Sequence, residues 1–328
     1  MAGRRFLVTG GSGFLGSALV KGLLTAGCAV RVLDDNSRGR PRRLTEVMRD
    51  VEFRHGDVRD AAAVDQAVQG VDGVCHLAYV NGTEFFYTMP DVVLEVAVKG
   101  MVHVMDACRR HGVEELYYAS SSEVYQTPPL VPTDESAPLS VPDPRNPRYS
   151  YGGGKILGEL MALHYGRSYL RRTVIFRPHN VYGPDMGWEH VLPQFITRLW
   201  DLREMNVHPL PFPIQGTGQE TRAFVHVDDF IQGLLLLIER GEHQGIYHIG
   251  HDREIAIADL ARLTAQCFGR EIDLIPGPAA PGGTLRRCPD ISRLRALGYQ
   301  PRRSLEEALP EMVRWYAENI HLAPGRGG

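Results

Sequence analysis

The chain has 328 residues, of which 43% are hydrophobic, and its 36 basic and 39 acidic residues leave a net charge of -3. This composition excludes disordered and collagen-like proteins and predicts one substantial core or two joined ones. The charge balance predicts no large basic surface, so nucleic acid is not an expected partner.

The first predicted elements are a strand at 5–9 and a helix at 14–26, which are joined by a glycine-rich turn. Gly10 supplies backbone torsions closed to other residues, Gly13 lets the main chain approach a pyrophosphate, and Gly16 lets helix and strand pack closely. The helix N-terminus then presents free N–H groups to the anion. The order predicts a phosphate-binding turn, although such turns also serve as plain strand-to-helix connections.

The next predicted strand, at 29–33, ends in Asp34. A carboxylate at this position can accept both ribose hydroxyls of an adenosine, whereas a 2'-phosphate would meet its negative charge. NAD is therefore favoured over NADP. Arg38 and Arg40 follow closely and keep NADP open as an alternative.

Strand-like and helix-like segments continue to alternate. Strands are predicted at 51–54, 73–77, 115–120 and 172–177, and helices at 60–69, 91–111 and 151–169. Such alternation implies right-handed crossovers and a parallel sheet covered on both faces, which is the doubly wound α/β class.

Past residue 178 the prolines and aromatic residues become denser, and the segment 209–213 is predicted to interrupt any regular element. A smaller second region therefore begins there, and a helix at 229–239 and a strand at 245–249 return to the first. The predicted division is a dinucleotide-binding domain at 1–177 plus about 229–249, and a substrate domain at about 178–228 plus 250–328.

Tyr151 and Lys155 stand one helical turn apart and so lie on one helix face. A free phenol has a pKa near 10 and is a poor base at neutral pH. One positive charge about 6 Å away, at an effective dielectric of about 20, lowers that pKa by about two units. The pair therefore predicts a tyrosine that acts as a base, and the positive charge of an oxidised nicotinamide would lower its pKa further. An ordinary exposed pair is the alternative, and Tyr149 is a competitor without a lysine at that offset.

Six segments together form a recognisable set. They are Thr9 to Gly16, Gly56-Asp57-Val58, His76-Leu77-Ala78, Ser120 to Tyr125, Tyr151 to Lys155, and Arg177 to Pro184. The set resembles the extended short-chain dehydrogenase/reductase family, specifically its nucleotide-sugar epimerases, dehydratases and decarboxylases. The resemblance implies a Rossmann-type fold with a smaller C-terminal α/β substrate domain. It also implies bound NAD, held by Gly10, Gly13, Phe14, Leu15, Gly16, Asp34, Asp57, Val58, Leu77, Ala78, Tyr151 and Lys155.

The catalytic residues that the resemblance implies are Ser121, Tyr151, Lys155 and Glu123. Ser121 would hydrogen-bond the reacting sugar hydroxyl, and Tyr151 would take its proton. Glu123 matches a glutamate that decarboxylases and 4,6-dehydratases of the family place beside C5 of the sugar. A glutamate at a strand end can equally pair with an arginine, and Ser122 lacks the aspartate of the thymidine-nucleotide glucose dehydratases.

The implied substrate-binding residues are Tyr79, Ser122, Asn180, Arg222 and Arg287. The two arginines would hold the diphosphate in charge-assisted, often bidentate hydrogen bonds. A nucleotide-diphosphate sugar is the expected partner.

The sequence also departs from the family pattern. Tyr79 stands where a second alanine is usual, Ala97 stands where an asparagine is usual, and the stretch 186–190 is expected to shape sugar selectivity. The glycine run 152–154 at a helix start costs about 1 kcal/mol per residue relative to alanine. Such a cost predicts close approach of the backbone to substrate or to a packed helix.

We therefore expect an NAD-dependent enzyme that oxidises C4 of a bound hexose, with C4 epimerisation as the first expected outcome. Dehydration or decarboxylation through Glu123 is the alternative. An NAD(H)-binding redox sensor without turnover is a hypothesis from another class, which retention of the catalytic residues disfavours. Surplus apolar residues on the helices 91–111 and 151–169 predict a homodimer through a helix bundle.

The scattered cysteines and histidines show no ligand spacing, so no metal site is expected. The run Leu234 to Ile238 is the longest late apolar stretch and is too short to cross a bilayer. We expect a cytoplasmic protein with no membrane contact.

Overall fold

The computed structural model describes residues 1–278 and 284–326 and contains a seven-stranded parallel sheet. The strand order is β3-β2-β1-β4-β5-β6-β11, so the chain changes direction across the sheet between β1 and β4. A doubly wound sheet carries its ligand crevice at this switch point, beyond the carboxyl ends of the strands. The strands are β1 (Arg5–Thr9), β2 (Ala29–Asp34), β3 (Val51–His55), β4 (Gly73–His76), β5 (Glu115–Ala119), β6 (Arg172–Pro178) and β11 (Gly245–Ile249).

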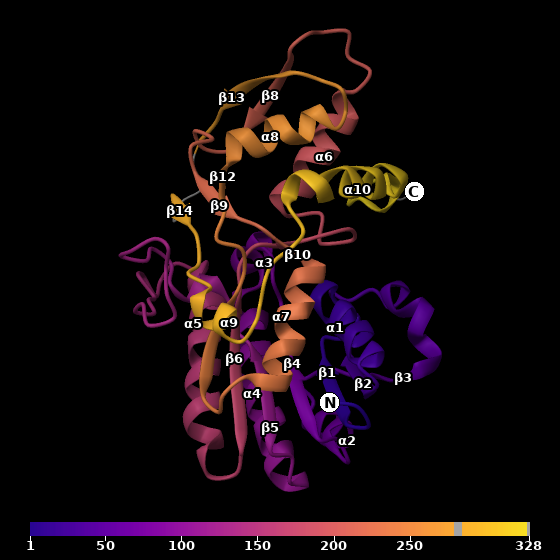
Figure 1. Ribbon diagram of the computed structural model, residues 1–328, viewed down its shortest axis with the longest axis vertical. Helices are drawn as coiled ribbons and strands as arrows, with labels where there is room; N and C mark the ends of the chain where they lie inside the picture. The colour runs from indigo at the N-terminus through magenta and orange to yellow at the C-terminus, as the bar shows by residue number, and fades with distance from the viewer. Residues whose placement is uncertain (279–283, 327–328) are drawn as a thin grey trace.

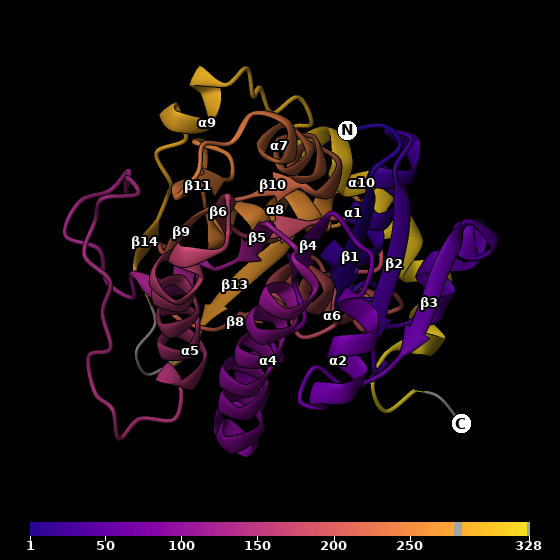
Figure 2. The same ribbon diagram turned by 90° about the horizontal axis from the view of Figure 1, so that it is seen from below.

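Helices cover both faces of this sheet (Figures 1 and 2). Helices α1 (Phe14–Thr25), α7 (Val227–Arg240) and α9 (Ser292–Ala296) share one apolar core with the sheet. Helices α2 (Ala61–Val68), α4 (Pro90–His111) and α5 (Tyr149–Leu160) share the other. The neighbours Tyr117 and Tyr118 of β5 enter opposite cores, as expected for a strand that is buried on both sides.

A third core lies beyond the carboxyl edge of the sheet, at the upper end of Figure 1. Its helices are α6 (Val191–Leu202), α8 (Ile257–Gln266) and α10 (Leu305–Glu318). Short strands form three small sheets in this part of the chain. In one, β8 (Leu210–Ile214) pairs with β13 (Ile272–Pro276), and in another, β7 (Val181–Tyr182) pairs with β10 (Val225–His226). In the third, β9 (Thr221–Ala223) lies between β12 (Glu254–Ala256) and β14 (Arg286–Arg287). The smaller C-terminal α/β part is thereby present.

The predicted return of the chain to the main sheet is confirmed, because β11 pairs with β6 and α7 packs on the same core as α1. The expected domain boundaries themselves stay a prediction. Helix α5 begins at Tyr149, and a π-helical turn (Met161–Tyr165) and a 3-10 turn (Gly166–Ser168) continue it. Several helical segments were not predicted. In the first part of the chain they include α3 (Thr83–Thr88) and a 3-10 stretch at Pro41–Asp50, and later in the chain they include α6, α8, α9 and α10.

The expectation that the proline-rich segment 209–213 forms no regular element is wrong. Residues 210–214 form β8, which pairs in parallel with β13. Leu210, Phe212 and Ile214 are buried, whereas Pro211 and Pro213 are exposed on the opposite face. Proline lacks an N–H and is tolerated at a sheet edge, and both strands of a two-stranded sheet are edges. None of the helices in the described residues is long and apolar enough to cross a membrane.

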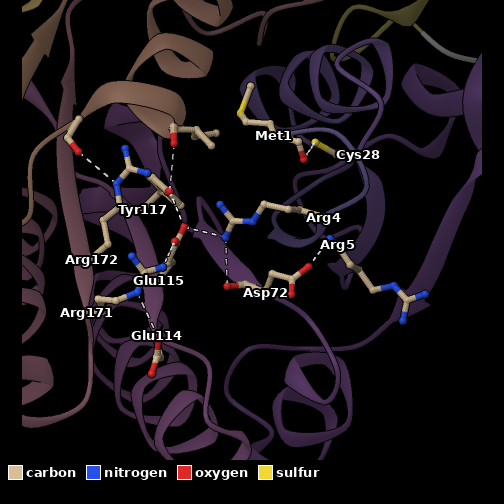
Figure 3. A network of polar contacts seen from close by, with 12 residues as sticks. Met1, Arg4, Arg5, Cys28, Asp72, Glu114, Glu115, Tyr117, Arg171 and Arg172 are labelled. Atoms are coloured by element: carbon tan, nitrogen blue, oxygen red, sulfur yellow. Dashed lines mark hydrogen bonds and ion pairs between the residues drawn. The ribbon is translucent and has the colours of Figure 1, made fainter.

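A buried carboxylate links three strands at their amino ends, at the end of the sheet opposite the crevice (Figure 3). Glu115 at the start of β5 accepts hydrogen bonds from Arg4 and Arg171, each at 2.7 Å, and from the Tyr117 hydroxyl at 2.8 Å. Its side chain is only 4% exposed. Burial alone would raise the pKa of Glu115, but the hydrogen bonds from Arg4 and Tyr117 hold it below its usual value.

Replacing Glu115 by alanine is expected to lower the free energy of unfolding by about 2 kcal/mol, because three donors lose their acceptor. Urea unfolding curves at neutral pH measure the change. The folded-state pKa of Glu115 lies below its unfolded value. Its contribution is therefore present above the unfolded pKa and is lost as the pH falls through the folded one, so wild type and variant converge once the pH is below the folded-state pKa.

Glu114→Ala is the matched control, because this neighbouring side chain is 58% exposed and its ion pair with Arg171 is long, at 3.2 Å. We expect a change below about 0.5 kcal/mol. Equal losses in the two variants would show that burial of the Glu115 carboxylate does not matter.

Candidate active site

A cavity of about 450 Å³ lies at the carboxyl ends of the sheet strands and is closed by residues that follow β6. Eighteen of the residues predicted from the sequence to hold cofactor or substrate, or to react, line it together. They are Gly10, Gly13, Phe14, Leu15, Gly16, Asp34, Asp57, Val58, Leu77, Ala78, Tyr79, Ser121, Ser122, Glu123, Tyr151, Lys155, Asn180 and Arg287. Arg222, the remaining predicted residue, is not in this lining. The roles of these residues stay predictions.

The glycine-rich turn has the shape of a phosphate cradle. Gly10 adopts a φ of 71°, and its carbonyl oxygen accepts the N–H of Gly13 at 3.1 Å. A Cβ on Gly16 would overlap that carbonyl oxygen, and a Cβ on Gly10 would lie 2.8 Å from the backbone of Ala78. Only glycines therefore let the turn close against β4 and α1, whose N-terminus faces the cavity.

Asp34 is fixed beside this turn. One carboxylate oxygen accepts the N–H of Ser12 and the other accepts the N–H of Asn36, both at 2.8 Å. Arg40 donates to the carbonyl oxygen of Gly39 and does not line the cavity. Arg38 and Arg43 also line the cavity, but each is paired with a carboxylate, Glu189 and Asp185 respectively. The Asp34 carboxylate beside the turn fits an adenosine ribose with free hydroxyls rather than a 2'-phosphate.

Asp57 also lines the cavity and is held by Arg59, whose guanidinium lies 2.6 Å away and reaches Glu95 at 3.1 Å. Burial would raise the pKa of Asp57, but the hydrogen bonds from Arg59 keep it below its usual value. The carboxylate is therefore charged at neutral pH and available to an adenine amino group.

Arg38 fastens the segment after β2 to the segment before α6. It donates to Glu189 at 2.8 Å and to the carbonyl oxygen of Asn81 at 3.0 Å, and its guanidinium lies 4.1 Å from the centre of the Phe85 ring. Both Arg38 and Glu189 line the cavity. This ion pair therefore joins a segment that follows a strand of the main sheet to a segment that precedes a helix of the third core.

The three central catalytic candidates converge from two elements. Ser121 follows β5 and accepts the N–H of Glu123 at 3.1 Å. Tyr151 and Lys155 lie in the first turns of α5 and are both buried. The Tyr151 ring stacks on Phe86 at a centroid distance of 4.9 Å and meets Tyr79 edge-to-face at 5.0 Å. Aromatic contacts therefore fix the orientation of this phenol.

The expected lowering of the Tyr151 pKa is not produced by the protein's own groups. Burial raises the pKa of Tyr151 to about 12, against a smaller opposing effect of the hydrogen bond from Ser121. Burial also lowers the pKa of Lys155 to about 7. The ammonium donates to the carbonyl oxygen of Ala119 at 2.6 Å and lies 5.8 Å from the centre of the Tyr151 ring. A basic Tyr151 therefore requires further positive charge, of the kind an oxidised nicotinamide carries.

Glu123 combines the two alternatives that the sequence left open. It lines the cavity beside the catalytic candidates and also pairs with Arg287 at 2.6 Å. Burial would raise the pKa of Glu123, but the charge and hydrogen bond of Arg287, with smaller effects of Arg148 and Arg222, keep it below its usual value. The side chain is therefore an anion at neutral pH, and its partner is a cation that a phosphate could also bind.

Arg222 lies beside Arg287, because β9 and β14 are paired in register at these two residues. Its guanidinium donates to the carbonyl oxygens of Thr221 and Thr284, both at 2.7 Å. Burial lowers the pKa of Arg222 to about 10, with Arg287 contributing. Asn180 donates its side-chain amide to the carbonyl oxygen of Ala223 at 2.9 Å, and its side-chain oxygen accepts no hydrogen bond from the residues that the structure describes.

The glycine run of α5 makes close contacts at two of its three positions. A Cβ on Gly152 would lie 2.6 Å from the Gln126 amide nitrogen, and a Cβ on Gly154 would overlap the Tyr79 hydroxyl. A Cβ on Gly153 would make an ordinary contact of 3.6 Å with Val141. The predicted close approach is thus confirmed, and the packed neighbours are protein groups.

Sequence reasoning missed several lining residues. Phe86 comes from the unpredicted helix α3, and its aromatic neighbours Phe85 and Tyr87 were the available signal. Within the stretch 186–190 the lining residues are Met186, Gly187, Glu189 and His190. Trp188 instead packs on Tyr316 at a ring-centroid distance of 4.7 Å, so its role is in the third core.

A family model described as the NAD-dependent epimerase/dehydratase family matches residues 6–250. The chain is 32% identical over 324 residues to a dTDP-glucose 4,6-dehydratase of Streptomyces antibioticus, which covers 95% of this chain and 92% of the relative. It is also 30% identical over 322 residues to UDP-glucuronic acid decarboxylase 1 of Arabidopsis thaliana. This match covers 96% of this chain and 70% of the relative.

A crystal structure shows the same fold. It is DesIV, a dTDP-glucose 4,6-dehydratase from Streptomyces venezuelae with NAD and TYD bound. The TM-score is 0.86 at 32% identity, and the match covers 98% of this chain and 99% of DesIV.

Gly16→Ala is expected to weaken binding of NAD at least about tenfold, because the added methyl group collides with the Gly10 carbonyl oxygen and opens the turn. Calorimetric titration with NAD measures the change, and circular dichroism shows whether the variant is folded. Gly153→Ala is the control, since its methyl group has room. Wild-type affinity in a folded Gly16→Ala protein would remove this turn from the cofactor site.

Proposed function

Because the chain belongs to the NAD-dependent epimerase/dehydratase family, we propose that it oxidises C4 of a nucleotide-diphosphate sugar and then expels a group, as a dehydratase or a decarboxylase. The observation that carries this proposal is the position of Glu123. Its carboxylate lines the same cavity as Ser121 and Tyr151. Oxidation and return of hydride need only a serine, a tyrosine and a lysine, so a carboxylate there supports a further step.

The first step uses Tyr151 as the base. Its oxygen takes the proton of the C4 hydroxyl, and Ser121 holds that hydroxyl by a hydrogen bond. NAD⁺, held by the residues of the glycine-rich turn, would supply the hydride acceptor for C4 and, once reduced, the hydride donor. Lys155 supplies positive charge on the same helix face. Arg287 and the neighbouring Arg222 neutralise the diphosphate of the substrate.

Two outcomes are open after oxidation. In dehydration Glu123 takes the C5 proton and the C6 hydroxyl leaves as water with a second proton. Addition of hydride to C6 is then accompanied by return of the proton from Glu123 to C5. In decarboxylation the C5–C6 bond of a hexuronate breaks, carbon dioxide leaves, and the electron pair of that bond stays on C5 beside the C4 carbonyl. C5 is then protonated, and addition of hydride to C4 is accompanied by return of the hydroxyl proton from Tyr151 to the C4 oxygen.

Ser122 favours the second outcome. It is buried at the cavity, and a serine hydroxyl is far too weak an acid to protonate a departing hydroxide. Carbon dioxide leaves without a proton, so decarboxylation needs no acid at this position. Epimerisation at C4, the first expectation from the sequence, is less well supported, since the dehydratases and the decarboxylase named above are 30–32% identical to this chain, whereas a UDP-glucose 4-epimerase of Thermotoga maritima is 26% identical.

A panel of UDP-, dTDP-, GDP-, CDP- and ADP-linked hexoses and hexuronates tests the proposal, with products identified by mass and NMR. Loss of one water or of one carbon dioxide from a panel member supports it and selects the outcome. Unchanged mass with inverted C4 assigns an epimerase instead. Binding of NAD(H) without conversion of any sugar would favour the redox-sensor hypothesis.

If the outcome is dehydration, Glu123→Gln is expected to leave transient NADH formation intact while lowering product formation at least about a hundredfold, because the amide cannot take the C5 proton. Stopped-flow absorbance and product assays separate the two steps. Glu114→Gln, an exposed carboxylate in the loop before β5, is the control. If Glu123→Gln turns over at the wild-type rate, the carboxylate serves only as the partner of Arg287.

We also propose that two copies pair through α4 and α5, which lie side by side (Figure 2). The outer faces of these helices expose Leu94, Leu157 and Leu160, the last by 50%. Exposed leucines gathered on two adjacent helices support an isologous four-helix contact. Leu160→Glu is expected to halve the mass measured by light scattering, whereas Leu322→Glu on a distant exposed leucine leaves it unchanged. A wild-type monomer at micromolar concentration would exclude the dimer.

A further inference from the structure

We propose that Tyr79 is a positioning residue, whose ring holds the Lys155 ammonium and packs against the Tyr151 ring, which it fixes for proton transfer. The proposal rests on the proposed function for its catalytic part, since it assigns Lys155 and Tyr151 to the reaction. Its geometric part concerns only residues within the protein.

The ring of Tyr79 is the aromatic face nearest to the ammonium. The Nζ atom of Lys155 lies 3.7 Å from the centre of that ring, against 5.3 Å for Tyr118 and 5.8 Å for Tyr151. One of its three N–H groups goes to the carbonyl oxygen of Ala119. A buried cation over the face of an aromatic ring is strongly stabilised, because little water competes for its charge.

The same side chain also contacts the catalytic tyrosine. The rings of Tyr79 and Tyr151 meet at an interplanar angle of 80°, which directs the edge of one to the face of the other. The Tyr79 hydroxyl donates to the carbonyl oxygen of Tyr151 at 3.4 Å. Tyr79 therefore touches both functional residues of the first two turns of α5.

The neighbours of Tyr79 are small enough to admit its ring. A Cβ on Gly154 would overlap the Tyr79 hydroxyl and would lie 2.8 Å from the Cβ of Ala97 on α4. Tyr79 and Ala97 are two of the positions at which the sequence departs from the family pattern. The structure brings both departures together at Gly154, so the large residue and the two small ones form one packed set.

The charge on Lys155 is sensitive to such contacts. Burial lowers its pKa to about 7, while Glu159 one turn later on α5 opposes this effect. Glu159 is itself paired with Arg177 at 2.6 Å, and burial keeps His76 on β4 neutral by lowering its pKa to about 3. The phenols of Tyr118 and Tyr151 complete the surroundings and are uncharged at neutral pH. Because this pKa lies near 7, a ring face that stabilises the ammonium increases the fraction of Lys155 that is charged at neutral pH.

The chain offers a direct measurement, because it contains only three lysines, Lys21, Lys99 and Lys155. Lys21 and Lys99 are 42% and 54% exposed and serve as internal controls. NMR titration of protein labelled at the lysine ε-carbon follows the three residues separately in wild type, Tyr79→Phe and Tyr79→Leu. Leucine fills much of the space without a π face.

We expect the pKa of Lys155 to be about one pH unit lower in Tyr79→Leu than in Tyr79→Phe, with both control lysines unchanged. In single-turnover reactions Tyr79→Leu is expected to form NADH about tenfold more slowly, with KM changed less than about twofold, and Tyr79→Phe to keep most of the rate. An equal or higher Lys155 pKa in Tyr79→Leu, in a protein of wild-type stability, overturns the proposal. The titration needs no substrate, so its failure is distinguishable from failure of the proposed function.

A second arm tests the packed set. Gly154→Ala is expected to lower the urea midpoint, and Tyr79→Phe is expected to reverse part of that loss, because it removes the overlapping oxygen. Gly153→Ala should show no such coupling with Tyr79→Phe. Strict additivity for Gly154 would show that Tyr79 and α5 do not share one packing constraint.

Discussion

The site depends on how closely α5 approaches its neighbours. This one helix carries both Tyr151 and Lys155, so its distance from β5 and α4 sets where the phenol and the ammonium stand. Gly154 faces Tyr79, and Gly158 lies against the Tyr118 hydroxyl, where a Cβ would overlap it. Glycine within a helix costs about 1 kcal/mol relative to alanine. The chain accepts this cost at the positions where a methyl group would push the helix away.

Charge is distributed unevenly across the cavity. Beside the turn of α1 the lining carries the carboxylates Asp34 and Asp57, and at the far side it carries Arg287 with Glu123. The ion pair keeps both partners charged in a poorly hydrated place, where an unpaired charge would be costly. An anionic ligand that drew Arg287 toward itself would leave Glu123 with less positive charge beside it. Under the proposed function, binding and proton transfer are therefore linked through the Arg287 guanidinium.

The sequence predicted well what is encoded locally. The parallel strands and the turn at Gly10 follow from apolar runs and glycine spacing, and all strands of the main sheet were found within two residues of their ends. Contacts between distant segments could not be predicted in this way. Arg38 and Glu189 are 151 positions apart, and neither local pattern indicates that they meet. Strand β8 escaped notice because its prolines suit an edge strand whose partner lies some 60 residues away, as its pairing with β13 shows.

The pKa of Tyr151 differs from the sequence expectation because burial outweighs the charge of Lys155. The spacing of Tyr151 and Lys155 suggested a simple attraction between charges, but it gave no measure of burial. Both groups are almost fully enclosed, and desolvation disfavours the charged form of each. Sequence spacing identifies which groups meet, whereas the surrounding side chains decide which protonation state they hold.

The Glu115 cluster and the reactive residues occupy opposite ends of the same strand. Strand β5 has five residues, so the two ends are separated by about 16 Å. Energetic effects of changes that far apart are generally additive. Substitutions at the Glu115 end of the sheet can therefore raise thermal stability without altering the cavity. Substitutions that change substrate preference at the cavity can likewise leave the Glu115 contacts intact.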